Sequence, residues 1–237
     1  MKIIDIPGWE RIEKAVGDVA AKRWDWFPNG FQGIHAVSNQ ELFAGTNVGR
    51  LYFSDADELV PGFRPASSLL GAVDAIAAGR KLSFKQEYAV ETLWHELVHG
   101  FTGIKPGRGA VGSEPIEEGV IQAFARHSYP MLLSEMGGTA SRQDKIIAAG
   151  YAYPVVTANL LEAMRLTGIT KEALMDLVMR RKQEWETELT EALSVGLGIK
   201  VDSIRRLYNY ASNKSPNLFM EKLTVLARNA PRNRAGF

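Results

Sequence analysis

The chain has 237 residues, of which 46% are hydrophobic and 23% are charged, proportions typical of ordinary globular proteins. Its net charge of +1 gives no overall field that would attract nucleic acid or an anionic membrane. Because the chain has no cysteine, disulfides and thiolate metal sites are excluded, and histidines and carboxylates remain as the good zinc ligands.

The beginning of the chain has no signal-peptide core, because Asp5, Pro7 and Glu10 interrupt the first apolar residues. No run in the sequence approaches the roughly 20 apolar residues that are needed to cross a bilayer. We therefore expect a soluble, cytoplasmic protein. The sequence predicts no membrane or nucleic-acid partner, and it indicates no particular oligomeric state.

The first third of the chain mixes helical and extended patterns. A helix is expected near the start, because the apolar residues that follow Trp9 recur at helical spacing. Its apolar side is formed by Ile12, Val16 and Val19. Two short β-like runs follow, at 33–37 and 47–53, and they predict a small N-terminal sheet. An Ala-rich helix is then expected over 67–78, with its end at Gly79.

A longer helix is predicted to begin at Ser83. Gln86 stands three residues later, which is the spacing of a capping box. Polar residues line up at a spacing of four along this helix: Glu91, His95 and His99. We expect the helix to end between residues 100 and 103. The stretch 100–112 contains five glycines and is predicted to be a flexible connector.

The rest of the chain reads as helical. Pro115 in the first turn and acidic residues around it predict a helix that begins at Glu114 and runs towards Pro130. A loop is expected at 137–141. Further helices are predicted over 154–195, 202–210 and 218–227, and the basic stretch 228–237 reads as a solvated tail rather than a nucleic-acid arm.

One stretch carries a chemical signature, His95-Glu96-Leu97-Val98-His99. Two histidines four apart on a helix are offset by about 40° and about 6 Å, so both imidazoles can converge on one metal ion. Glu96 lies next to the first histidine and can act on a water at the metal. The alternative is a helix whose two histidines only pack or face solvent.

A candidate third ligand lies further along the chain. Glu118 follows His99 after 18 intervening residues, and Gly119 comes directly after it. In this pattern the sequence resembles the gluzincin zinc metallopeptidases, which combine H-E-x-x-H with a Glu-Gly pair on a second helix. The resemblance covers about residues 51–166. It implies that His95, His99 and Glu118 hold Zn²⁺ and that Glu96 is the general base.

The chemistry of zinc supports this interpretation independently. Catalytic zinc takes three protein ligands and keeps one position for water, and two His with one Glu is a standard set. Glu117 competes with Glu118 as the ligand; the spacing favours Glu118, and Glu117 then serves the helix dipole. Gln122 and Arg126, one and two turns beyond Glu118, are candidates for hydrogen bonds to a ligand or for plain interfacial contacts.

Two other metal classes are excluded by the residues around the motif. A metzincin needs Gly and His where this chain has Thr102 and Lys105. A di-iron carboxylate bundle needs two Glu-x-x-His pairs, and the sequence contains one, Glu96 with His99.

The residue that would stabilise the oxyanion is less clearly marked. Tyr151 and Tyr153 precede a helix start at Pro154. A similar Tyr-Pro start follows the Glu-Gly helix in some gluzincin-like proteins, and that resemblance favours Tyr153 as the catalytic donor. Two packing tyrosines are the alternative. His127 is the only histidine downstream of the motif and is a weaker candidate.

These observations predict a mainly helical α+β fold, a zincin-like domain with a small sheet, two zinc-ligand helices and a helical C-terminal half. We expect residues 1–150 to hold the sheet and both zinc helices, and residues 151–237 to complete the cleft. The expected reaction is zinc-dependent hydrolysis of peptide bonds in a peptide or protein substrate. The run 47–53 is a candidate for the sheet edge at which zinc proteases add the peptide as a strand. The alternatives are a non-catalytic zincin-fold structural or assembly protein that retains the metal, and a helical interaction protein with a fortuitous motif.

Overall fold

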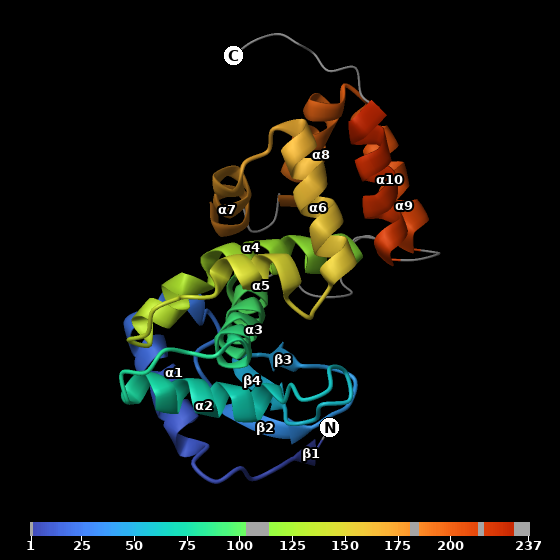
Figure 1. Cartoon of the computed structure of the whole chain (residues 1–237). Helices are drawn as coiled ribbons and strands as arrows, with labels where there is room; N and C mark the ends of the chain where they lie inside the picture. Colours follow the sequence, from blue (N-terminus) through green and yellow to red (C-terminus); the bar gives the residue numbers. More distant parts are fainter. Residues whose placement is uncertain (1, 103–113, 181–184, 213–215, 230–237) are drawn as a thin grey trace. The chain divides into compact units, whose positions relative to one another are not determined.

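The computed structural model describes residues 2–102, 114–180, 185–212 and 216–229 (Figure 1). In these ranges the chain forms ten α-helices and one four-stranded sheet, which is a mainly helical α+β fold, as predicted. The predicted connector from residue 103 onward and residues 230–237 of the predicted tail lie outside the described ranges.

The chain divides into two compact units. The first consists of Met1–Gly103 and Ala125–Tyr151, and the second of Ile104–Phe124 and Ala152–Phe237. The predicted boundary after residue 150 falls next to the junction at 151 and 152. The stretch 114–124, which we expected in the first part, groups instead with the second unit, so the division falls within one helix.

The sheet of the first unit has the strand order β1-β2-β4-β3. Its strands are β1 (Lys2–Ile3), β2 (Ile34–Ser38), β3 (Ala44–Asn47) and β4 (Arg50–Ser54). The central pair β2–β4 is parallel, and both outer pairs are antiparallel. Sequence analysis expected one run over 47–53, but this run spans a hairpin. Val48 and Gly49 both have positive φ, 46° and 82°, which is the conformation of a two-residue hairpin turn.

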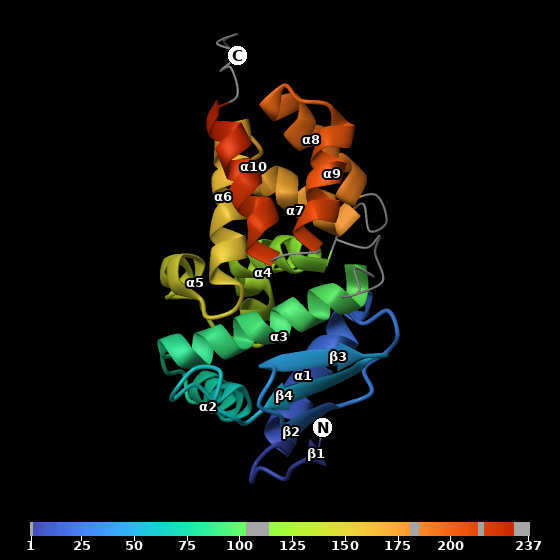
Figure 2. The ribbon, with the colours of Figure 1, turned by 90° about the vertical axis from the view of Figure 1, so that its right-hand side faces the viewer.

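Three helices cover one face of this sheet. Helices α1 (Glu10–Lys22), α2 (Pro65–Ala77) and α3 (Phe84–Thr102) pack on β2, β4 and β3 respectively (Figure 2). Successive strand residues face opposite sides, and those facing the helices are fully buried: Ile34, Ala36, Leu51 and Phe53. The pair His35 and Tyr52 stands between them on the other face and is only half-buried, with the rings 5.8 Å apart. A 3-10 turn, η1 (Trp24–Trp26), connects α1 to the sheet.

The start of α3 is fixed by the predicted capping box. The Ser83 backbone N–H donates to Gln86 Oε1 at 2.8 Å, and the Gln86 N–H donates back to Ser83 Oγ at 3.3 Å. The preceding helix α2 ends as predicted, with Gly79 in the left-handed region at φ 63°. The two local signals therefore set where the central helix begins.

Helix α4 (Glu114–Glu135) runs past Pro130, although we expected it to end there. A proline has no N–H, so the carbonyl four residues earlier, that of Arg126, loses its helical donor. The side-chain amide of Gln143 replaces it, donating to the carbonyls of Arg126 at 3.3 Å and His127 at 2.8 Å. Gln143 opens the short helix α5 (Gln143–Ala149), which the sequence analysis did not predict.

The second unit is helical in its described residues. The predicted run 154–195 is three helices, α6 (Pro154–Thr167), α7 (Lys171–Arg180) and α8 (Trp185–Leu197). Gly168, at φ 78°, ends the first of them in the left-handed conformation that favours glycine. Helices α9 (Val201–Ser212) and α10 (Pro216–Asn229) follow as predicted. Helix α10 packs on α6 and α9, and α8 contacts α6, α7 and α9.

In the described ranges, no helix taken singly has the length and apolar composition to cross a membrane. The bent pair α5 and α6 meets those two criteria only when its members are taken together.

Candidate metal centre

The two histidines of the motif lie on α3 with their ring nitrogens facing each other. His95 Nε2 and His99 Nε2 are 3.0 Å apart. Both side chains are buried, with 7% and 5% of their surface exposed. Two nitrogens bound to one tetrahedral zinc are separated by roughly 3.3 Å, so the observed spacing is close to that of two ligands on one ion.

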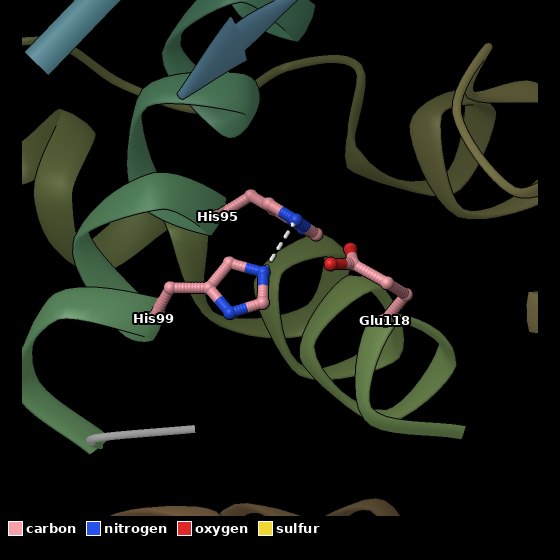
Figure 3. A group of neighbouring side chains, drawn as sticks. All are labelled: His95, His99 and Glu118. Carbon is pink, nitrogen blue, oxygen red and sulfur yellow. Dashed lines mark hydrogen bonds between the residues drawn. The ribbon is translucent and has the colours of Figure 1, made fainter. Parts of the chain in front are cut away.

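Glu118 completes the group from α4. The residue is 7% exposed, and one ligand atom from each of His95, His99 and Glu118 lies within 4.8 Å of the other two. Figure 3 shows the Glu118 carboxylate turned towards the imidazoles. The three predicted ligands thus form a buried group that could hold a metal ion.

The chemistry of this donor set fits zinc. Two imidazoles and one carboxylate suit a transition metal or zinc, whereas calcium prefers six to eight oxygen ligands. The set also matches catalytic zinc sites, which use three protein ligands. Among the described residues, the group includes Glu118 and not the neighbouring Glu117, although Glu117 is buried as well. The structure therefore agrees with the choice that the spacing favoured.

The predicted general base belongs to the same helix as the two histidines. Glu96 is on α3 between them in sequence, and it is half-buried where they are buried. A helix turns by about 100° per residue, so Glu96 points about 60° away from the direction of His99. It therefore does not share the direction of either histidine, and it keeps part of its surface exposed.

The candidate tyrosines have different surroundings. Tyr151 belongs to an aromatic cluster of the first unit, where its ring centre lies 5.1 Å from that of Phe63 and 5.0 Å from that of Tyr88. It is a packing residue there. Tyr153 is 44% exposed and precedes the first turn of α6, with a left-handed backbone at φ 47°. His127 is half-buried on α4.

The predicted companions of Glu118 form a buried polar stripe on α4. Gln122 and Arg126 are almost completely buried. The Arg126 guanidinium donates to the carbonyls of Ile147 at 3.2 Å and Gly150 at 3.1 Å. These carbonyls end α5, so Arg126 fixes that helix end to α4.

Gly119, directly after Glu118, allows a close helix contact in the second unit. A Cβ atom added at Gly119 would lie 2.7 Å from Val156 Cγ1 on α6, which is closer than Cβ contacts allow. Val156 is buried and stands one turn after Tyr153. The glycine of the Glu-Gly pair therefore lets the first turn of α6 pack directly on α4 beside Glu118.

A strand edge runs beside the metal helix. β3 ends the sheet, so in the described chain one side of its backbone pairs with no other strand. It packs on α3 (Figure 2). The preceding Phe43 lies near Tyr88 of α3, with ring centres 6.5 Å apart. The sequence analysis placed this edge in the run 47–53, but most of that run is the interior strand β4.

One buried residue was missed at the sequence level. Glu87 lies on α3, fully buried, eight residues before His95. It extends the spacing of four that Glu91, His95 and His99 follow, and this spacing was the signal that could have found it.

Comparison of the chain with protein-family models, with curated proteins and with solved structures finds no match.

Proposed function

We propose that the chain is a zinc-dependent peptidase of the gluzincin type, with His95, His99 and Glu118 as ligands. One observation carries the proposal. Eighteen residues of chain lie between His99 and Glu118. Nevertheless, the ligand atoms of the two imidazoles and of the Glu118 carboxylate lie within 4.8 Å of one another, and all three residues are buried. A zinc ion held there would polarise a peptide carbonyl and lower the pKa of a water to about 7.

In this proposal Glu96 moves the proton. Its carboxylate accepts a proton from the attacking water and passes it to the nitrogen of the departing amine, so that one C–N bond breaks and one C–O bond forms. Glu96 is half-buried and directly follows His95 in the sequence, which supports this role.

The substrate would bind as an extended strand along β3. Backbone N–H and C=O groups at a sheet edge pair with any peptide sequence, and this suits an enzyme that must orient a main chain. The strand consists of small and polar residues, and a Cβ added at Gly45 meets nothing within 4 Å. Such an edge would leave room for the side chains of the substrate.

Tyr153 is the proposed donor to the oxyanion. Its left-handed φ of 47° is uncommon for a bulky residue, and strained residues of this kind concentrate at functional sites. The contact of Val156 with Gly119 ties the start of α6 to the turn of α4 that carries Glu118. Both observations support Tyr153 over Tyr151, which packs among aromatic rings.

A second candidate function is a non-catalytic protein that retains the metal. Structural zinc sites are closed by protein, and all three donors here are more than nine-tenths buried. Glu96 separates the two functions, because a structural site needs no base.

The test begins with zinc stoichiometry, measured by elemental analysis after supplementation and dialysis. We expect one zinc per chain in wild type and in Glu96→Gln, and none in His95→Ala. A peptide library is then incubated with wild type and Glu96→Gln. Wild type should cut it at least about a hundredfold faster, since general bases contribute factors of this size.

Each negative result has its own meaning. If zinc fails to bind in wild type, both candidate functions are wrong. If zinc binds but the two proteins cut peptides equally slowly, the peptidase is wrong and the non-catalytic metal protein remains.

A further inference from the structure

Glu87 is a fully buried carboxylate with several hydrogen-bond donors around it. It accepts hydrogen bonds from four donor groups: the Tyr129 hydroxyl at 2.5 Å, the backbone N–H and hydroxyl of Ser141 at 3.1 and 3.2 Å, and the Arg142 N–H at 2.8 Å. Hydrogen bonds to a buried charged group are strong, so this carboxylate holds α3, α4 and the loop before α5 in one arrangement.

The bond between Tyr129 and Glu87 has a defined direction. Burial, and then the hydrogen bond to Glu87, raise the pKa of the Tyr129 phenol far above its ordinary value of 10.0. The phenol therefore stays protonated and is the donor of the hydrogen bond to Glu87. A second bond between the same two helices comes from the neighbouring residue, because Trp94 Nε1 donates to Ser128 Oγ at 2.7 Å. Two adjacent residues of α4 are thus fixed to α3.

Tyr129 and Glu118 lie on the same face of α4. They are eleven positions apart, which is three turns and leaves a difference of only about 20° in direction. Gln122 and Arg126 lie between them on the same buried stripe. The rotation of α4 about its axis that directs Tyr129 to Glu87 is therefore the rotation that directs Glu118 to the histidines.

We infer that Glu87 and Tyr129 are positioning residues of the metal centre, acting through the rotation of α4. Neither belongs to the proposed ligand set. The hydroxyl of Tyr129 selects one orientation of the helix, and Glu118 is thereby held ready for the ion. The inference rests on the proposed zinc site and needs no peptidase activity.

The experiment compares zinc affinity and the spectrum of the Co²⁺-substituted protein. Tyr129→Phe deletes one hydroxyl, and we expect about a tenfold loss of zinc affinity in a chelator competition, as for other partners outside the ligand set. The Co²⁺ absorption bands should shift, because the geometry of the Glu118 ligand changes. Glu87→Gln keeps one acceptor oxygen and should lose affinity too.

Ser54→Ala is the matched control. It also removes one buried hydroxyl from the first unit, where Ser54 donates to the carbonyl of Asn39 on a segment that does not include α4. Its affinity and spectrum should equal those of wild type, even where its melting temperature falls. A purely structural role of Tyr129 would lower the melting temperature alone.

The outcomes separate this inference from the proposed function. Unchanged affinity and Co²⁺ bands in both Tyr129→Phe and Glu87→Gln would overturn the positioning role while the zinc site stands. Weaker zinc binding and shifted Co²⁺ bands in these variants support the positioning role. This holds also if wild type binds zinc but cuts no peptide, a result that would overturn only the proposed peptidase activity. A wild type without zinc overturns both.

Discussion

Two carboxylates, one from each unit, have opposite surroundings. In the first, Glu87 is fully buried and accepts bonds from four donor groups of two other segments. In the second, Glu162 lies at the surface of α6, where it pairs with Arg165 at 2.8 Å on the same helix and with Arg228 of α10 at 3.6 Å.

This difference shows where geometry is fixed. A buried carboxylate that loses its donors leaves unpaired polar groups behind, so it tolerates one arrangement of the surrounding helices. A surface ion pair can be replaced by water at little cost. The unit with the buried network also carries His95 and His99, the two histidines of the group that could hold a metal ion.

The largest effect should follow from replacing the buried carboxylate of Glu87 by an apolar side chain. Glu87→Leu leaves the hydroxyl of Tyr129 and two backbone N–H groups without their acceptor, and we expect a loss of about 3 kcal/mol or more in unfolding free energy. Urea unfolding of the metal-free protein measures this loss. In this variant, amide hydrogen exchange should speed up more in α3, which carries Glu87, and in the neighbouring α5 than in α9 and α10 of the second unit.

Glu162→Leu is the control for that comparison, since it is the same substitution in the second unit. If the two variants lose equal stability, the contrast between these two carboxylates is wrong.

Local signals explain what could be predicted from the sequence. The start of α3 follows from a capping box within four residues, and the metal group follows from a spacing of four plus a second-helix glutamate. These patterns are written in short stretches of chain. The periodicity of Ile12, Val16 and Val19 likewise predicts α1, and all three are buried.

The predictions that were wrong share a different cause. In each, a residue distant in sequence or an unusual backbone conformation changed what the local pattern indicated. Pro130 should end a helix, but Gln143 supplies the donor that the proline lacks. A turn at Val48 and Gly49 is hard to anticipate, because a β-branched residue rarely adopts positive φ. Nothing in the spacing of Glu87 and Tyr129, 42 residues apart, indicates that they pair.

An intermediate effect is expected at the close contact of α4 and α6. Gly119→Ala would place a methyl group 2.7 Å from Val156 Cγ1, and a β-branched side chain in a helix has little freedom to turn away. Overpacking costs about 1–3 kcal/mol and the gain in helix propensity returns up to about 1, so the second unit should lose about 1–2 kcal/mol.

The matched control is Gly17→Ala in α1 of the first unit. Its added Cβ would meet Phe31 at an ordinary 3.7 Å, so the propensity gain should appear as a rise of up to about 1 kcal/mol. Thermal unfolding of both variants measures whether each substitution raises or lowers the stability. A stabilised Gly119→Ala would contradict the tight contact described for α6.

The smallest effect is expected at the surface pair of the second unit. The hydrogen bond from Arg165, more than the charge of Arg228, lowers the pKa of Glu162 below its ordinary 4.5. A lowered folded-state pKa means that the carboxylate stabilises the fold above pH 4.5 and that this contribution is lost as the pH falls through the lower folded value. Glu162→Gln should therefore leave the melting temperature at pH 7 nearly unchanged and flatten its decline as the pH falls below 4.5. Added salt should shrink even this difference, because an exposed pair is screened. A large destabilisation at pH 7 that persists in about 1 M salt would mean that Glu162, like Glu87, is held in one arrangement.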